Sequence, residues 1–272
     1  QSGILMRRDV NELRRFYAGP LGRATRDMLG RKLTETWGDV AGLDVLGLGY
    51  ATPFLERFPR ARRTVASMPA EQGVEAWPAT GAGARTCLAR EGALPFPNAL
   101  FDRVLVVHGL EESDDPLALL REVWRVMAPS GRVVLAAAAR SGVWCHAEAT
   151  PFGYGRPFTR GQLEQLARKA ELEPIAWSRA LYAPPISGLA RHAEAFEQAG
   201  ARLWPRFAGL ILLEAVKQTF AVKPKGLGAP ARAFLPGALR PARSALDGQA
   251  SGIWPQRARK THETLGGGPH SP

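Results

Sequence analysis

The sequence contains few of the residues that build covalent crosslinks or metal centres. Two cysteines, Cys87 and Cys145, and five histidines occur among 272 residues. Two cysteines make no disulfide framework and match no zinc-binding spacing. We therefore predict two buried thiols in a reducing compartment and no metal site.

Long apolar runs are missing as well. The longest stretches, such as 133–139 and 208–213, fall far short of the roughly 20 residues that span a bilayer. The first residues, QSGILMRRDVNELRRF, carry charges where a signal peptide has its apolar region. These features predict a chain with no membrane span and no signal peptide, and a cytoplasmic location.

Lysine is scarce, whereas arginine is abundant: the chain has 6 lysines and 30 arginines, and its net charge is +11. A net charge of +6 belongs to residues 221–272, which leaves +5 for the first 220 residues. A basic chain suggests contact with nucleic acid. A GC-rich coding sequence gives the same excess of Arg, Ala, Gly and Pro, so the charge does not decide the function.

The apolar pattern alternates between short runs and amphipathic stretches, which is typical of βαβ units around a mainly parallel sheet. Seven segments are candidate strands: Leu43–Leu48, Arg63–Ala66, Arg85–Ala89, Arg103–His108, Arg132–Ala139, Ile175–Tyr182 and Gly209–Val216. The sequence therefore predicts an α/β fold.

Capping residues mark the helices between these strands. Asp115 and Pro116 suit the start of a helix that ends at 129–131, Pro-Ser-Gly. Thr159 and Gln162 form a capping box, and Pro174 suggests the end of that helix. Ahead of the first strand, residues 10–37 predict one or two helices, with a break near Gly19-Pro20.

The first strand leads into a glycine-containing turn, LDVLGLGYATPFL, in which Thr52 can cap the next helix. Glycines at such a turn let the backbone approach a ligand, and a helix N-terminus offers free N–H groups. The turn does not fit a dinucleotide. Gly47 and Gly49 lack the third glycine of that fingerprint, and residues 66–69 hold no acid.

The segment from Leu94 to Ala137, LPFPNALFDRVLVVHGLEESDDPLALLREVWRVMAPSGRVVLAA, is more specific. It has an LPFP turn, Phe-Asp at the opening of a strand, a helix capped by Asp-Pro, and a Pro-x-Gly turn. This segment resembles the middle of class I S-adenosylmethionine-dependent methyltransferases of the small-molecule, methyltransferase-11-like type. The similarity extends from about Gly42 to Lys217.

The resemblance implies a Rossmann-like sheet of seven strands in the order 3-2-1-4-5-7-6. Strand seven would be antiparallel, and helices would cover both faces. It also divides the chain into an N-terminal helical segment (1–40), a methyltransferase-like domain (41–220) and a basic tail (221–272). The tail is rich in Pro, Gly, Ala and Arg and is predicted to be disordered.

S-adenosylmethionine is the cofactor that the resemblance implies, at the carboxyl ends of the first strands. The positions that match its binding residues are Gly47, Gly49, Tyr50, Ala51, Ser67, Met68, Arg90, Glu91 and His108. Several of them depart from the family's pattern, so its cofactor motifs are degenerate here. Ala51 and Pro53 replace glycines of the family's turn.

Three carboxylates that the family uses to hold the cofactor are replaced or displaced. Gly47 stands in the place of the first, and residues 66–68, Ala-Ser-Met, supply no acid for the ribose hydroxyls. Near the adenine, Glu91 can substitute from one place out of register, beside Arg90. Each lost charge-assisted hydrogen bond is worth roughly 1.5–3 kcal/mol, so we expect weakened binding unless backbone groups, Ser67 or water compensate.

Candidate catalytic and substrate-binding residues follow from their places in the family's fold. His108 ends the fourth strand, where a neutral imidazole can act as a base; a histidine bonded to the backbone is the alternative. Four residues of the region that covers the substrate can contact it: Trp144, His146, Tyr154 and Arg156. Packing of that loop through Phe152 and Phe158 is the alternative there.

Three functions therefore stay open at the level of sequence. The first is a methyltransferase that acts on an unidentified small molecule. The second is a non-catalytic scaffold with the methyltransferase fold, which binds a protein or ribonucleoprotein partner. The third is an RNA methyltransferase that uses the basic tail as an arm along phosphates.

Overall fold

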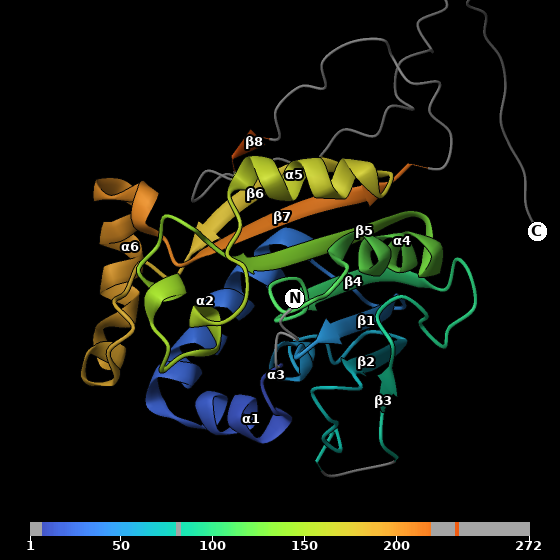
Figure 1. Ribbon diagram of the computed structural model, residues 1–272, viewed down its shortest axis with the longest axis horizontal. Coiled ribbons are helices and arrows are strands. Elements are labelled where there is room, and N and C mark those ends of the chain that lie inside the picture. Colours follow the sequence, from blue (N-terminus) through green and yellow to red (C-terminus); the bar gives the residue numbers. More distant parts are fainter. Residues whose placement is uncertain (1–6, 80–82, 219–231, 234–272) are drawn as a thin grey trace, which may run out of the picture. The chain divides into compact units, whose positions relative to one another are not determined.

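A mixed β-sheet forms the centre of the fold (Figure 1). The computed structural model of the chain describes residues 7–79, 83–218 and 232–233, and in this part eight strands follow the order β3-β2-β1-β4-β5-β7-β6-β8. Strands β1 to β5 pair in parallel, and β7 is antiparallel to both β5 and β6. The predicted order 3-2-1-4-5-7-6 is thereby confirmed. The strands are β1 (Asp44–Gly49), β2 (Arg63–Pro69), β3 (Thr86–Ala89), β4 (Phe101–Val107), β5 (Met127–Ala138), β6 (Leu172–Ala180), β7 (Leu210–Lys217) and β8 (Arg232–Ala233).

Helices cover both faces of the sheet, as the resemblance implies. They are α1 (Val10–Ala18), α2 (Pro20–Trp37), α3 (Thr52–Leu55), α4 (Pro116–Val126), α5 (Arg160–Lys169) and α6 (Ala193–Leu203), with short 3-10 helices at Trp144–His146, Pro151–Gly153, Ser187–His192 and Pro205–Phe207. Helices α4 and α5 lie on one face, and α1, α2 and α3 lie on the other (Figure 1). Within the part of the chain that is described, none of these helices is both long enough and apolar enough to cross a bilayer.

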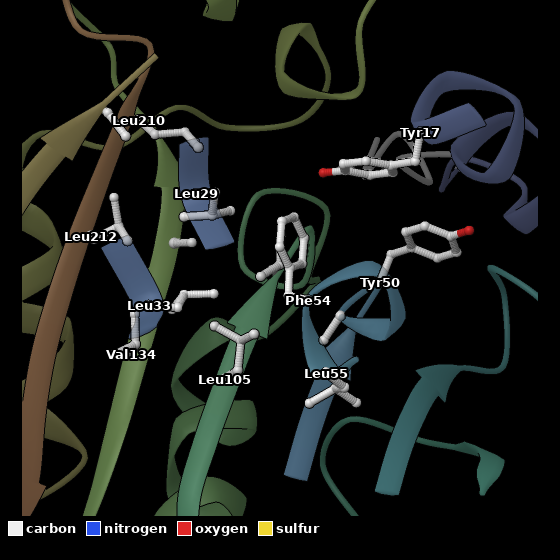
Figure 2. Close-up of a cluster of buried hydrophobic side chains, with 14 of the residues drawn as sticks. Tyr17, Leu29, Leu33, Tyr50, Phe54, Leu55, Leu105, Val134, Leu210 and Leu212 are labelled. Atoms are coloured by element: carbon white, nitrogen blue, oxygen red, sulfur yellow. The ribbon is translucent and has the colours of Figure 1, made fainter. Parts of the chain in front are cut away.

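Each face of the sheet has its own hydrophobic core. Leu29 and Leu33 of α2 pack with Phe54 against Leu105 and Val134 of the sheet (Figure 2). All five are 0–1% exposed. Burying side chains of this size contributes about 1.5–3 kcal/mol each, so α2 is firmly held against the sheet.

The predicted helix signals hold at three places. The side chain of Asp115 accepts hydrogen bonds from two backbone N–H groups at the start of α4. Thr159 and Gln162 make the reciprocal bonds of a capping box on α5. The break at Gly19-Pro20 separates α1 from α2.

Two predicted boundaries are wrong. Helix α5 ends at Lys169, and Pro174 lies inside β6 at a shift in register instead of ending the helix. A bulge accommodates a residue that has no N–H to donate, which explains why proline is tolerated in this strand. Strand β5 begins at Met127 and includes the predicted 129–131 turn, where Ser130 has a φ of 59°.

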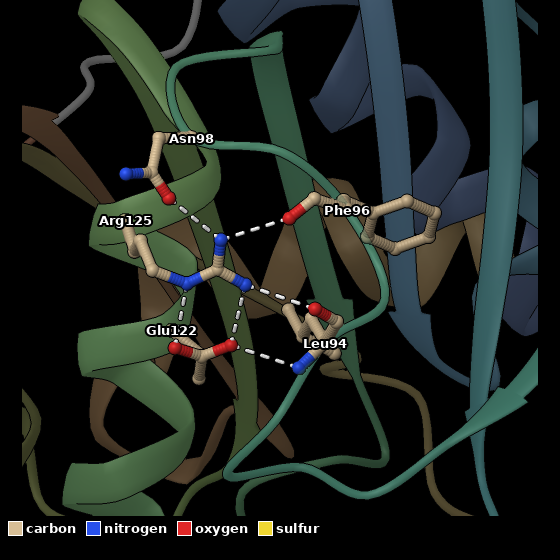
Figure 3. A network of polar contacts seen from close by, with 5 residues as sticks. All are labelled: Leu94, Phe96, Asn98, Glu122 and Arg125. Carbon is tan, nitrogen blue, oxygen red and sulfur yellow. Dashed lines mark hydrogen bonds and ion pairs between the residues drawn. The ribbon is translucent and has the colours of Figure 1, made fainter.

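One arginine ties the LPFP turn to α4. The Arg125 guanidinium donates to the carbonyls of Leu94 and Phe96 and to the side chain of Asn98, and it pairs with Glu122 at 2.7 Å (Figure 3). Glu122 in turn accepts from the backbone N–H of Leu94. This network fixes the segment that leads from β3 to β4.

Two residues of the predicted tail belong to the sheet. Arg232 and Ala233 form β8, which pairs in parallel with Ala176 and Trp177 of β6. These two residues form a strand because the open edge of β6 offers them backbone partners, and the disorder of the tail stays a prediction. The rest of the 221–272 segment lies outside the described residues. The chain divides into two units, Gln1–Pro236 and Gly237–Pro272, and every described residue belongs to the first.

Candidate functional site

A small cavity lies at the carboxyl ends of β1, β2 and β3. Its volume is about 10 Å³, roughly the room that one water molecule needs. Four of the predicted cofactor residues line it: Gly49, Ser67, Met68 and Glu91. The other lining residues are Leu48, Pro69, Ala89, Leu94 and Leu119. The sequence analysis assigned none of these five to the cofactor, and one of them, Leu119, comes from α4.

The turn after β1 requires a glycine at one position. Gly49 has a φ of 78°, and a Cβ atom there would lie 2.2 Å from the carbonyl oxygen of Val107. Gly47 is enclosed in a different way: a Cβ atom would lie 2.6 Å from the Cβ of Ala51 and 2.9 Å from Leu55. Ala51 and Leu55 therefore fill the space that the family's acidic side chain would need.

A carboxylate from another segment reaches the turn. Glu75, from the loop between β2 and β3, accepts hydrogen bonds from the hydroxyls of Thr52 (2.6 Å) and Tyr50 (3.1 Å). Burial, together with the nearby charge of Glu75, raises the pKa of Tyr50. The prediction that Thr52 caps α3 is wrong, because its hydroxyl bonds Glu75 and Ala51 takes the capping position. Nothing in the sequence near Glu75 marks this contact.

Arg90 and Glu91 have different surroundings. Arg90 is exposed and is not among the residues that line the cavity. The Glu91 carboxylate lines the cavity, accepts a hydrogen bond from the hydroxyl of Ser113 at 2.6 Å, and pairs with Arg7 at 2.6 Å. Burial raises the pKa of Glu91, and the charge of Arg7 opposes that effect. Glu91 is thus the carboxylate available at this cavity.

His108 follows β4, as predicted, but its ring is enclosed. Its Nε2 lies 2.7 Å from the Tyr17 hydroxyl, and Phe152 packs against its ring at 4.6 Å. Burial lowers the pKa of His108 to about 3 and raises that of Tyr17, so a neutral imidazole and a neutral phenol share this hydrogen bond. An imidazole of such low basicity, with its nitrogen already bonded, is a poor proton acceptor.

Glu111 is the functional candidate that sequence reasoning passed over. It is 4% exposed, and one of its oxygens accepts from the backbone N–H of Ala138 at 2.8 Å. The other oxygen, Oε2, has no hydrogen-bond partner among the described atoms. Burial raises the pKa of Glu111 to about 7. A sequence signal for this site does exist. Glu111 stands three residues after His108 and opens the segment Glu-Glu-Ser-Asp-Asp (111–115), in which helix capping explains Asp115 but not Glu111.

The four predicted substrate residues separate into two groups. Trp144 is buried, with its indole N–H bonded to the carbonyl of Ala183, and His146 is exposed. Tyr154 and Arg156 lie near the acidic run: Arg156 donates to the Ser113 carbonyl, and the Arg8 guanidinium lies 3.8 Å from the centre of the Tyr154 ring. The structure therefore brings Tyr154 and Arg156 to one rim and makes Trp144 part of the core.

A second, larger cavity of about 420 Å³ lies at the start of β2 and β3. It is lined by Arg62, Arg63, Thr64, Val65, Ala84, Arg85, Thr86, Cys87 and Phe96. Arg62 pairs with Asp44 at 2.6 Å. Neither Arg63 nor Arg85 forms an ion pair with a carboxylate in the described part of the chain. This groove is therefore open and basic.

The fold and the match to known proteins agree. Residues 43–135 match the family model of the methyltransferase domain. This part of the chain is thus similar to a methyltransferase domain. An uncharacterised protein of Mycobacterium tuberculosis is 33% identical to it over 142 residues, which are 48% of this chain and 47% of that protein. A demethylmenaquinone methyltransferase of Lactococcus lactis is 48% identical over 42 residues, 15% of this chain and 17% of that enzyme. The chain spans about half the length of the mycobacterial relative, and less of the enzyme.

Two solved structures share the fold of this chain. One is an S-adenosylmethionine-dependent methyltransferase of Thermotoga maritima, described as a possible histamine N-methyltransferase. It has a TM-score of 0.54 and 18% identity, over 77% of this chain and 96% of that one. Another comes from a Haloferax volcanii complex with the Trm112 methyltransferase activator. Its TM-score is 0.53 and its identity 15%, over 70% of this chain and 89% of that one.

The residues around the small cavity are of the kinds that S-adenosylmethionine needs around it. Met68, Leu94 and Leu119 offer apolar walls for an adenine ring, and Glu91 offers an acceptor for a hydroxyl or amino group. Gly49 lets the backbone come close. The room is far too small in this arrangement, since a volume of about 10 Å³ holds no ring system. Side chains at the rim must move before the cofactor can enter.

Proposed function

We propose that this chain is a methyltransferase that uses S-adenosylmethionine to methylate a small molecule, in the cytoplasm. The observation that supports this best is the position of the small cavity in the sheet. It lies at the carboxyl ends of β1 to β3, beside the glycine turn, and a carboxylate lines it. In open α/β sheets, ligands bind at this edge, near the point where the strand order reverses.

Each residue of the site has a distinct task in this proposal. The bound cofactor supplies an activated methyl group. Met68 and Leu94 would enclose the adenine, Glu91 would accept a hydrogen bond from the adenosyl group, and Gly49 would let the turn come close to it. Positioning of the two reactants in this way supplies a large part of the rate enhancement in methyl transfer.

The acceptor side requires a group that can take up a proton when the acceptor is an alcohol or an amine. Glu111 suits this task better than His108. Its carboxyl group has an unpaired oxygen and a pKa raised by burial to about 7, near the operating pH of most enzymes. His108 keeps a neutral ring and holds Tyr17 in place.

The experiment begins with the purified protein as it is isolated. Mass spectrometry after denaturation detects S-adenosylmethionine or S-adenosylhomocysteine carried through purification, and isothermal titration measures their affinity. We expect binding that is weaker than a site with all three carboxylates would give. If neither compound binds at millimolar concentration, the proposed activity is refuted.

A second candidate is a non-catalytic scaffold that binds a protein or ribonucleoprotein partner. The size of the small cavity favours it, as does the loss of carboxylates at Gly47 and Met68. Removal of residues 237–272, which leaves β8 on the edge of β6, separates the two functions. An enzyme keeps its turnover without this part of the basic tail, whereas a scaffold that binds through it loses its partner.

The second, larger cavity, at the start of β2 and β3, favours a third candidate, an RNA methyltransferase. Arg63 and Arg85 line an open basic surface at which phosphates can bind. RNA affinity should then fall steeply with salt, and replacing Arg63 and Arg85 by alanine should flatten that dependence. A flat salt response of the unaltered protein would exclude this function.

A further inference from the structure

The chain's own N-terminal segment, residues 7–18, contacts a residue that lines the small cavity and the turn beside it. Arg7 comes before α1 and pairs with Glu91, the carboxylate that the proposed function assigns to the cofactor. The Arg7 side chain is 6% exposed and that of Glu91 is 16% exposed, so the pair is largely shielded from water. A guanidinium in this place occupies the acceptor that an adenosyl group needs.

Arg8 fastens the same segment to the far side of the site. Its backbone N–H donates to the Glu112 carboxylate at 2.8 Å, and its guanidinium donates to the carbonyl of Glu148 at 2.7 Å. The guanidinium also stacks over the ring of Tyr154. Two neighbouring arginines therefore bridge both sides of the rim.

Tyr17 closes the site above the glycine turn. Its ring stacks on Tyr50 with centroids 5.7 Å apart and planes 22° apart, and its hydroxyl bonds His108. Figure 2 shows the rings of Tyr17 and Tyr50 lying one above the other beside Phe54. The turn after β1 and the end of β4 are thus joined by one side chain of α1.

We propose that residues 7–18 form an internal plug of the cofactor site, in which Arg7 occupies Glu91 and Tyr17 covers the turn at Tyr50. This proposal rests on the proposed function. It explains why a cavity in the right place, with lining of the right kind, has a volume of only about 10 Å³. The cofactor enters when the segment leaves, so the closed form lowers its apparent affinity.

The packing of α1 against α2 shows how the plug can be displaced by a substitution outside the cofactor site. Helix α1 ends at Ala18 and α2 starts afresh at Pro20, with Gly19 between them, so α1 can move while α2 stays packed. A Cβ atom at Gly22 of α2 would lie 2.0 Å from the carbonyl oxygen of Phe16 and 2.6 Å from the Cα of Tyr17. Gly22→Ala therefore pushes α1 away from α2.

The experiment measures S-adenosylhomocysteine affinity by isothermal titration for the full chain and four variants. Arg7→Ala removes the competing guanidinium, and Gly22→Ala displaces α1. We expect both to bind at least about tenfold more tightly than the unaltered chain. Arg15→Ala changes an exposed arginine of the same helix, and Gly161→Ala adds a methyl group in open space. Both should stay within about twofold.

Hydrogen exchange provides a readout that does not depend on the variants. Adding S-adenosylhomocysteine to the unaltered chain should speed exchange in residues 7–18 if the plug is expelled. Slower or unchanged exchange would overturn the proposal, as would Arg7→Ala and Gly22→Ala binding no more tightly than the unaltered chain.

The titrations also separate the plug from the proposed function. If the unaltered chain binds and the variants bind equally well, the cofactor assignment stands and the plug is refuted. If neither the chain nor its variants bind S-adenosylhomocysteine at millimolar concentration, both proposals are refuted, because weakening the contacts of residues 7–18 does not then allow the compound to bind.

Discussion

Glu111 makes folding stability depend on pH. Burial raises the pKa of its carboxyl group to about 7 in the folded chain, from an ordinary value near 4.5. Between these values the folded state holds a proton that the unfolded state releases. The contribution is therefore present below about pH 4.5 and is lost as the pH rises through about 7.

We expect Glu111→Gln to remove this dependence. Urea unfolding at pH 5 and pH 8 should show the unaltered chain losing stability across the interval by an amount that does not exceed about 3 kcal/mol. The variant should lose less. Glu56→Gln, at an exposed position, is the control. Equal losses for the chain and for Glu111→Gln would contradict the assignment of this pKa.

A pair of glycines separates backbone strain from crowding at the turn. Gly42 and Gly49 have similar φ values, 75° and 78°, but a Cβ atom at Gly42 meets nothing within 4 Å. Gly42→Ala should cost about 1–2 kcal/mol of unfolding free energy from strain alone. Gly49→Ala should cost clearly more, because its methyl group would strike the Val107 carbonyl. Chemical denaturation of both variants checks this, and equal costs would show that the clash is relieved.

At this scale the sequence assigned residues to the cofactor but could not give their contacts. Of the assigned residues, Gly49, Ser67, Met68 and Glu91 line one cavity, and their binding of a cofactor stays a prediction. The bond from Glu75 to Thr52 joins residues 23 positions apart, and Arg7 pairs with Glu91 across an even longer separation. No local pattern records such pairs. They arise when separate segments meet at one edge of the sheet.

At the scale of elements, the Arg125 network links the stability of α4 to the cofactor cavity. Arg125 satisfies the carbonyls of Leu94 and Phe96, and Leu94 lines the cavity (Figure 3). Removal of the guanidinium leaves these carbonyls without a donor. It also leaves the charge of Glu122 without its cation.

Arg125→Ala should therefore lower the unfolding free energy by about 1–3 kcal/mol and weaken S-adenosylhomocysteine binding. Arg121→Ala, at an exposed position on the same helix, should change neither quantity by much. Thermal unfolding and titration measure the two effects. An unchanged affinity in a destabilised Arg125→Ala protein would show that the LPFP turn keeps its shape without the arginine.

Elements were predicted better than their ends. All seven predicted strands and the break at Gly19-Pro20 are present, because apolar periodicity and caps are local signals. The end of α5 was misplaced, because Pro174 reads as a helix stop and the bulge that accepts it depends on pairing with β7. The order of the strands came from the family resemblance, since periodicity carries no information on neighbours.

At the scale of the whole molecule, the division into two units predicts which part of the chain carries stability. A chain that ends at residue 236 keeps β8 on the edge of β6. It should unfold within about 1 kcal/mol of the full chain and bind the cofactor equally well. A chain that ends at residue 218 uncovers that edge and should aggregate more readily. Chemical denaturation and light scattering test both, and a large loss of stability in the first chain would show that residues 237–272 support the fold.

The position of β7 between β5 and β6 also determines when the sheet can be completed during synthesis. β6 pairs with β7 and has no bond to β5, so it stays detached until residues 210–217 have emerged from the ribosome. Until then β5, which is almost fully apolar from Val133 to Ala138, presents an open side to other nascent chains. Strand β7, which is made after β6, is therefore the strand that closes the sheet between β5 and β6. A chain whose synthesis stops before residue 210 should therefore need a chaperone, because β5 stays open on one side.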